Sequence, residues 1–159
     1  MTTDSVEAKR ILPLIVFAQF ACTSLWFAGN AILPELQLAF HLPTSSLAHL
    51  TSSVQLGFIS GTLLFALLTI SDRFSPSKVF FFCAVAGAIV NVSITLVTSS
   101  VALFLLRALV GFFLAGIYPV GMKISADYHE KGLGKALGYL VGALVVGTAL
   151  PHLIRMMST

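Results

Sequence analysis

One basic side chain lies inside an apolar stretch of the sequence, where a charge is costly. Arg107 stands about six residues into the run from residue 101 to residue 122, or roughly 9 Å along a helix. At the centre of a membrane helix a charged side chain costs about 2.5 kcal/mol or more. We therefore expect Arg107 to face the interior of a helix bundle. The alternative is a side chain that snorkels to the membrane interface and only anchors its helix.

Four uncharged polar side chains lie at comparable depth in other apolar runs. Gln19 and Asn30 fall in the first run, Gln55 in the second and Asn91 in the third. Gln55 and Asn91 are interpreted as hydrogen-bond partners between helices, each worth about 0.6–2 kcal/mol.

The sequence offers no recognisable metal or catalytic motif. His41 and His49 are eight residues apart, which is not a spacing that brings two ligands to one helix face. The stretch 127–130, DYHE, is contiguous and polar, which favours a solvated loop. An intramembrane enzyme needs a nucleophile with a base, or a helical H-E-x-x-H pair, and the sequence has neither. We expect no metal, no cofactor and no enzymatic activity.

Composition assigns the chain to the membrane. Of the 159 residues, 57% are hydrophobic and only 9% are charged, whereas soluble domains keep about a quarter charged. The net charge of +3 does not indicate nucleic-acid binding, because the basic residues stand singly between apolar runs. Residues 1–159 are therefore predicted to form one all-α membrane bundle whose main partner is the lipid bilayer. Its five spans, each near the ~20 residues that cross a bilayer, are expected over residues 11–33, 47–70, 79–98, 101–122 and 137–154.

Small residues recur four apart within three of these spans. Apolar side chains gain nothing by leaving lipid for another helix, so helices in a bilayer associate where small residues let their backbones approach. The spacing predicts close helix packing at the following glycines: Gly57 and Gly61, Gly111, and Gly134, Gly138 and Gly142.

The basic residues also predict an orientation. If the N-terminus is cytoplasmic, seven Lys and Arg residues fall on the inner side, and Arg155 falls on the outer side. The positive-inside rule therefore predicts a multi-pass protein with a cytoplasmic N-terminus.

Two stretches near the predicted cytoplasmic side carry a family resemblance. In the first, SDRFSPSK at residues 71–78, Asp72 and Arg73 match the loop signature that follows the second helix of the major facilitator superfamily. The glycine and two basic residues of that signature are replaced, by Ser75, Pro76 and Ser77. The second is residues 107–123. With Leu103 just before it, this stretch resembles the family's fourth-span signature at Leu103, Arg107, Gly111 and Ala115, with Val110 where a glutamine is common.

This resemblance implies a fold of twelve spans in two six-helix bundles, built from inverted three-helix repeats. The five spans are then part of the N-terminal bundle, with the sixth span and the C-terminal transporter helices missing from this chain. The implied function is transport of a small solute by alternating access, with protons as a candidate coupling ion, in a bacterial inner membrane. The alternative is a non-transporting helical membrane subunit or scaffold that assembles with a partner.

The resemblance also implies roles for particular residues. Spans one and four line the path in this family, so Arg107, Asn30 and Trp26 are expected to form one wall, with Gln19 facing the path. Arg107 would couple protons or bind an anionic solute. Asp72, Arg73 and Asp127 are candidates for cytoplasmic gating, with Arg73 and Asp127 paired across the ends of spans two and four.

Overall fold

The computed structural model describes residues 3–43, 45–129 and 132–158, and within these ranges every regular element is helical. The helices are α1 (Thr3–Ala31), α2 (Leu33–Phe40), α3 (Ser46–Leu67), α4 (Ile70–Arg73), α5 (Pro76–Ser93), α6 (Ser100–Leu114), α7 (Tyr118–Tyr128) and α8 (Leu133–Ser158), with a 3-10 turn at Ile94–Leu96.

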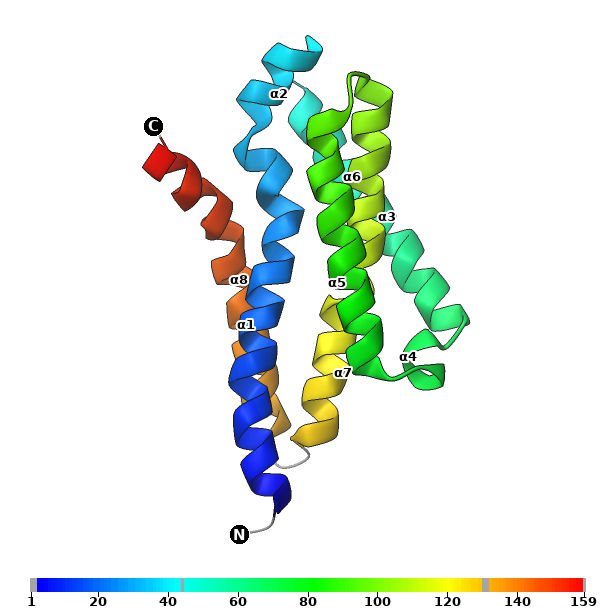
Figure 1. The fold of residues 1–159 in the computed structure, drawn as a ribbon, viewed down its shortest axis with the longest axis vertical. Helices are drawn as coiled ribbons and strands as arrows, with labels where there is room; N and C mark the ends of the chain where they lie inside the picture. The colour runs from blue at the N-terminus through cyan, green and yellow to red at the C-terminus, as the bar shows by residue number, and fades with distance from the viewer. Residues whose placement is uncertain (1–2, 44, 130–131, 159) are drawn as a thin grey trace.

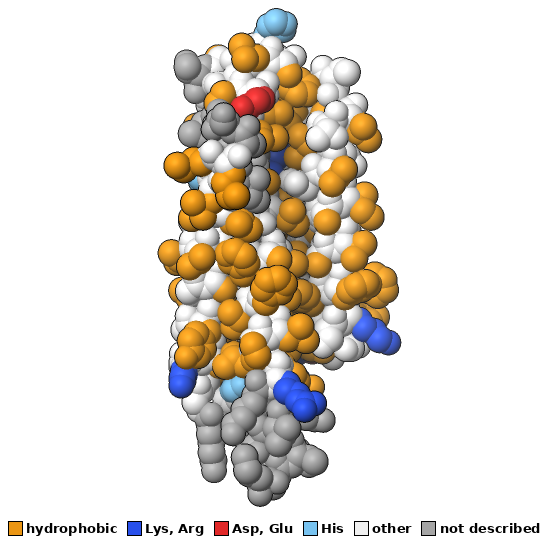
Figure 2. Space-filling view, turned by 60° about the vertical axis from the view of Figure 1, so that its left-hand side comes forward, with side chains coloured by type: hydrophobic (Ala, Val, Ile, Leu, Met, Phe, Trp, Pro, Cys, Tyr) orange, Lys and Arg blue, Asp and Glu red, His pale blue; other side chains and the backbone are white. Residues whose placement is uncertain are grey.

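Within the described residues, five stretches are long and apolar enough to cross a membrane, as the sequence predicts. They are Arg10–Ala28, Ala48–Leu67, Pro76–Leu96, Ser100–Tyr128 and Leu133–Leu150. Many large apolar side chains point outward; Phe17 and Phe82, for example, are 68% and 67% exposed. Such a surface suits lipid rather than water, and Figure 2 shows it as a broad apolar band above a lower end where most of the visible Lys and Arg side chains gather.

The spans run alternately up and down (Figure 1). The chain rises through α1 to the short α2, descends through α3 to α4, rises through α5, descends through α6 and α7, and rises again through α8. The most extensive packing joins α3 to α6 and α1 to α8, while α5 lies against α6 and α7.

Glycines set the close approach of α3 and α6. A Cβ added to Gly57 would lie 2.6 Å from the carbonyl carbon of Ala108, and one added to Gly61 would lie 2.6 Å from the carbonyl oxygen of Phe112. On the facing helix, a Cβ on Gly111 would lie 2.8 Å from the carbonyl carbon of Val54. Backbone meets backbone at all three glycines, so no side chain fits between these helices.

The glycine stripe of α8 behaves differently, which corrects the sequence-based expectation. A Cβ added at Gly134, Gly138 or Gly142 would meet no atom of the described chain within 4 Å. The buried face of α8 is instead a second stripe of mostly small residues, Ala136, Leu140, Ala143 and Gly147. At Gly147 an added Cβ would lie 3.2 Å from the carbonyl oxygen of Phe20, so this stripe is the one that packs on α1.

The fourth span, expected as one helix over residues 101–122, is broken into α6 and α7. The turn between them makes short i→i+3 hydrogen bonds, from Gly116 N–H to Phe113 and from Ile117 N–H to Leu114, both 3.0 Å. Pro119 in the first turn of α7 explains the break, because proline has no N–H to continue the ladder and clashes with the preceding turn. Gly116 lies in this turn where no side chain fits, since an added Cβ there would lie 2.8 Å from the Phe65 ring.

Candidate functional site

A hollow with polar groups in its lining lies among α1, α3, α8 and the break in the fourth span. It is a cavity of about 530 Å³, within the range of small-molecule sites. Helical periodicity aims its side chains inward, since residues three, four and seven apart share one face of a helix. Its lining residues are Thr23, Trp26 and Phe27 of α1, Thr51, Gln55 and Phe58 of α3, Leu114 and Tyr118 at the break, and Leu144, Val145 and Thr148 of α8.

Aromatic rings dominate one part of this cavity. Trp26 and Phe58 meet edge to face, with ring centroids 5.3 Å apart and an interplanar angle of 68°. The Phe27 ring lies 6.4 Å from that of Trp26. Edge-to-face pairs of this kind hold each ring in a defined orientation, so α1 and α3 present an ordered aromatic wall.

The polar side chains of the cavity differ in whether they already have hydrogen-bond partners within the described chain. The Thr23 hydroxyl donates to the carbonyl of Gln19 at 2.8 Å, and the Thr148 hydroxyl donates to that of Val145 at 2.7 Å. Neither Thr51 nor Gln55 has a hydrogen-bond partner among the described residues, and Gln55 is exposed to the cavity. Within the described chain, Gln55 therefore does not form the helix–helix hydrogen bond that the sequence suggested.

Arg107 is fully buried, as expected, but it does not line the cavity. Its guanidinium donates to the carbonyls of Leu25 (3.3 Å) and Trp26 (2.5 Å) in α1 and to Oδ1 of Asn91 (3.3 Å) in α5. The Asn91 contact is the interhelical hydrogen bond predicted for that residue. Its three acceptors in the described chain are uncharged, and the side chain does not snorkel to an interface. Arg107 thus joins α6 to α1 and α5.

The remaining predicted path residues do not assemble into one wall. Of the three whose side chains the structure describes, Trp26 alone lines the cavity, and it meets Arg107 through its backbone carbonyl. Gln19 is fully buried against α7, where an added Cβ on Gly121 would lie 2.5 Å from its Oε1, and its amide atoms have no hydrogen-bond partner in the described chain. The Asn30 side chain lies outside the described residues.

The gating candidates lie at the end of the bundle away from α2, and they also pair differently from the expectation. Asp72 of α4 forms a salt bridge with Lys123 of α7, and Lys123 also donates to the carbonyl of Ser71 at 3.0 Å. Arg73 and Asp127 are both exposed and form no ion pair with each other. Lys123 was missed because sequence spacing does not reveal which of several basic residues faces Asp72.

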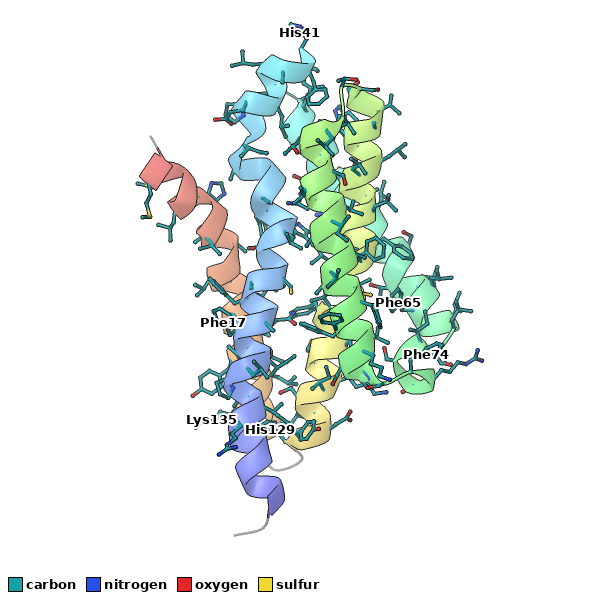
Figure 3. All side chains as sticks on the ribbon, viewed as in Figure 1. Phe17, His41, Phe65, Phe74, His129 and Lys135 are labelled. Atoms are coloured by element: carbon teal, nitrogen blue, oxygen red, sulfur yellow. The ribbon has the colours of Figure 1, made fainter. Side chains whose placement is uncertain are left out.

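The two ends of the bundle are chemically distinct. Figure 3 places His129 and Lys135 at one end and His41 at the other. The Asp72–Lys123 pair joins α4 to the last helix before the loop that carries His129. Among the described residues, Arg73, Lys78, Lys123 and Lys135 belong to the end that carries His129, and the positive-inside rule uses such an excess of Lys and Arg.

These features define a multi-pass helical membrane protein with an internal cavity. The family model of the Major Facilitator Superfamily matches residues 15–151, and the chain belongs to that superfamily. The family resemblance found in the sequence is thereby confirmed.

One relative from the curated proteins is an uncharacterised transporter of Buchnera aphidicola subsp. Acyrthosiphon pisum (strain APS). It is 26% identical to this chain over 152 residues, which cover 95% of the chain and 37% of the relative. The chain therefore spans about 37% of the length of the curated relative it matches. No solved structure is significantly similar to the chain.

Proposed function

We propose that this chain forms part of a secondary transporter that moves a small solute by alternating access, and that the 530 Å³ cavity is its share of the solute path. The cavity carries the proposal, because it joins two helices of the first repeat to the fourth and fifth spans. Membership of the superfamily and the similarity to a transporter support it. The helices that complete the path lie beyond this chain in the proposal, as the shared length of the relative suggests.

In this proposal Arg107 positions the wall and does not contact the solute. Its guanidinium binds the α1 backbone at Leu25 and Trp26, directly behind the aromatic wall. Holding that turn of α1 against α5 and α6 fixes where the Trp26 ring projects. A proton-coupling or anion-binding role for Arg107 would require it to leave three hydrogen bonds, and it is not part of our proposal.

The proposed orientation puts the N-terminus and the Asp72–Lys123 pair on the cytoplasmic side. That pair joins the segment after the second span to the last part of the fourth. Closing and opening of the cytoplasmic mouth would then make and break it. Its partial exposure, 33% for Lys123 and 70% for Asp72, suits a contact that must be reversible.

Substituted-cysteine labelling tests whether the cavity is a water-filled path. Cys22 and Cys83 are first replaced by serine, and Gln55→Cys is compared with Leu56→Cys, its neighbour on α3, which is 65% exposed on the outer surface. We expect a hydrophilic thiol reagent to label position 55 in native membranes and to leave position 56 unlabelled. A lipid-buried subunit or scaffold predicts no labelling at either position, and that result would refute the proposal.

A further inference from the structure

We propose that the part of the solute lying against this bundle is an uncharged apolar ring carrying a hydrogen-bonding group, and that it is neither an anion nor a cation. This inference rests on the proposed function, since it takes the cavity to be the solute site. It goes further by assigning a chemical class to what binds there.

The lining itself favours such a group. Trp26, Phe27, Phe58 and Tyr118 provide aromatic surface, and the polar lining is limited to threonine and glutamine side chains. No charged side chain lines the cavity in the described chain. Gln55 carries an amide that both donates and accepts, and its hydrogen-bonding capacity is unused by the described residues, so it suits a hydroxyl or an amide on the ring.

An anion finds no ready partner at this wall. Arg107 bonds the carbonyls of Leu25 and Trp26 and does not line the cavity, so its charge attracts an anion without direct contact. It is 0% exposed, so an incoming carboxylate or phosphate cannot reach it without breaking those bonds. The remaining donors are neutral, and neutral hydrogen bonds are weaker than charge-assisted ones.

A cation is disfavoured for a different reason. Aromatic rings attract cations, but a carboxylate partner is missing from the described lining. In addition, the positive charge of Arg107 is held by uncharged acceptors only, directly behind Trp26. That charge has no acidic partner among its bonded groups, so it repels a second positive charge at this wall. An uncharged group needs no counter-ion in the lining and is not repelled by Arg107.

The one tryptophan of the chain lies in this wall, so its fluorescence reports binding there. Three probes share a nitrobenzyl ring, which quenches tryptophan, and differ in charge: 4-nitrobenzyl alcohol, 4-nitrobenzoate and 4-nitrobenzylammonium. Each is titrated into the purified chain in lipid nanodiscs. We expect saturable quenching by the alcohol with a Kd at least tenfold lower than that of either charged probe.

Two variants and a matched control assign the signal to the cavity. Phe58→Ala removes a ring from the wall, while Phe82→Ala removes the same ring from the outer surface of α5. We expect the Kd for the alcohol to rise at least fivefold in the first and to stay unchanged in the second. Gln55→Leu, a milder change at the cavity surface, should also raise it, because the hydroxyl loses its partner.

The outcomes separate the two levels of the proposal. Equal or tighter binding of the benzoate or the ammonium probe, still sensitive to Phe58→Ala, would overturn the charge assignment and leave the solute path standing. Quenching that fails to saturate for all three probes, or that ignores both Phe58→Ala and Gln55→Leu, would overturn the solute path itself.

Discussion

The packing of α3 on α6 makes a prediction that can be worked out from distances. In Gly111→Ala the new Cβ would lie 2.8 Å from the carbonyl carbon of Val54 and 2.9 Å from the amide nitrogen of Phe58. Carbon contacts are comfortable at about 3.5–4.0 Å, so the two backbones must separate by roughly 1 Å. Both neighbours are backbone atoms and cannot rotate away. Overpacking of this kind costs about 1–3 kcal/mol.

The same substitution at Gly138 is a matched control on another span. An added Cβ there meets no described atom within 4 Å, so no helix has to move. Replacing a glycine in a helix by alanine then stabilises by up to about 1 kcal/mol. That propensity gain also offsets part of the cost at Gly111. We expect Gly138→Ala to exceed Gly111→Ala in stability by about 1–3 kcal/mol.

The assay is reversible unfolding of the purified chain in mixed micelles, in which an increasing fraction of denaturing detergent is followed by circular dichroism and by Trp26 fluorescence. Equal midpoints for the two variants would show that α3 and α6 are not in backbone contact. A lower midpoint for Gly138→Ala would show that the stripe on α8 is packed within this chain, contrary to the structure.

Three further predictions concern the charged residues. Arg107→Lys should destabilise the bundle more than Arg107→Met, because lysine keeps the buried charge but loses the planar fork that reaches three acceptors. The same detergent titration measures this difference. The reverse order of stability would contradict the role of Arg107 in joining α6 to α1 and α5. Asp72→Asn should cost less than about 1 kcal/mol, since its pair with Lys123 is partly exposed; a double-mutant cycle measures the coupling, and a larger value would make the pair a structural lock. Cysteine at position 78 should be protected from an impermeant reagent in intact cells while cysteine at position 41 is labelled, and the opposite pattern would invert the topology.

Hydropathy alone predicts the spans well, but it does not predict how they rotate. In water a helix shows its buried face by its apolar stripe, whereas in lipid both faces are apolar and that signal disappears. On α8 the sequence contains two candidate packing stripes, and the conspicuous one, with Gly138 at its centre, faces outward. The stripe that packs includes Leu140 and Gly147, which spacing alone could not single out.

For the candidate site, the sequence predicts which side chains are buried but not which neighbours they contact. The cost of a charge in lipid is large, so the burial of Arg107 follows from its position alone. Which neighbours it bonds depends on helix rotation, and the guanidinium turns to the α1 backbone instead of the cavity. The inward stripe Thr51, Gln55 and Phe58 does have helical spacing, and reading it as a mixed polar and aromatic face would have located the cavity.

In the proposed function the Trp26 ring faces a water-accessible cavity and not lipid, and quenching of its fluorescence distinguishes the two environments. The chain has one tryptophan, so the signal is unambiguous. The structure predicts strong quenching by acrylamide, a small neutral molecule dissolved in water, and weak quenching by phosphatidylcholine brominated along its acyl chains. Strong quenching by the brominated lipid, with acrylamide ineffective, would show that the Trp26 ring faces lipid and would refute the proposed solute path.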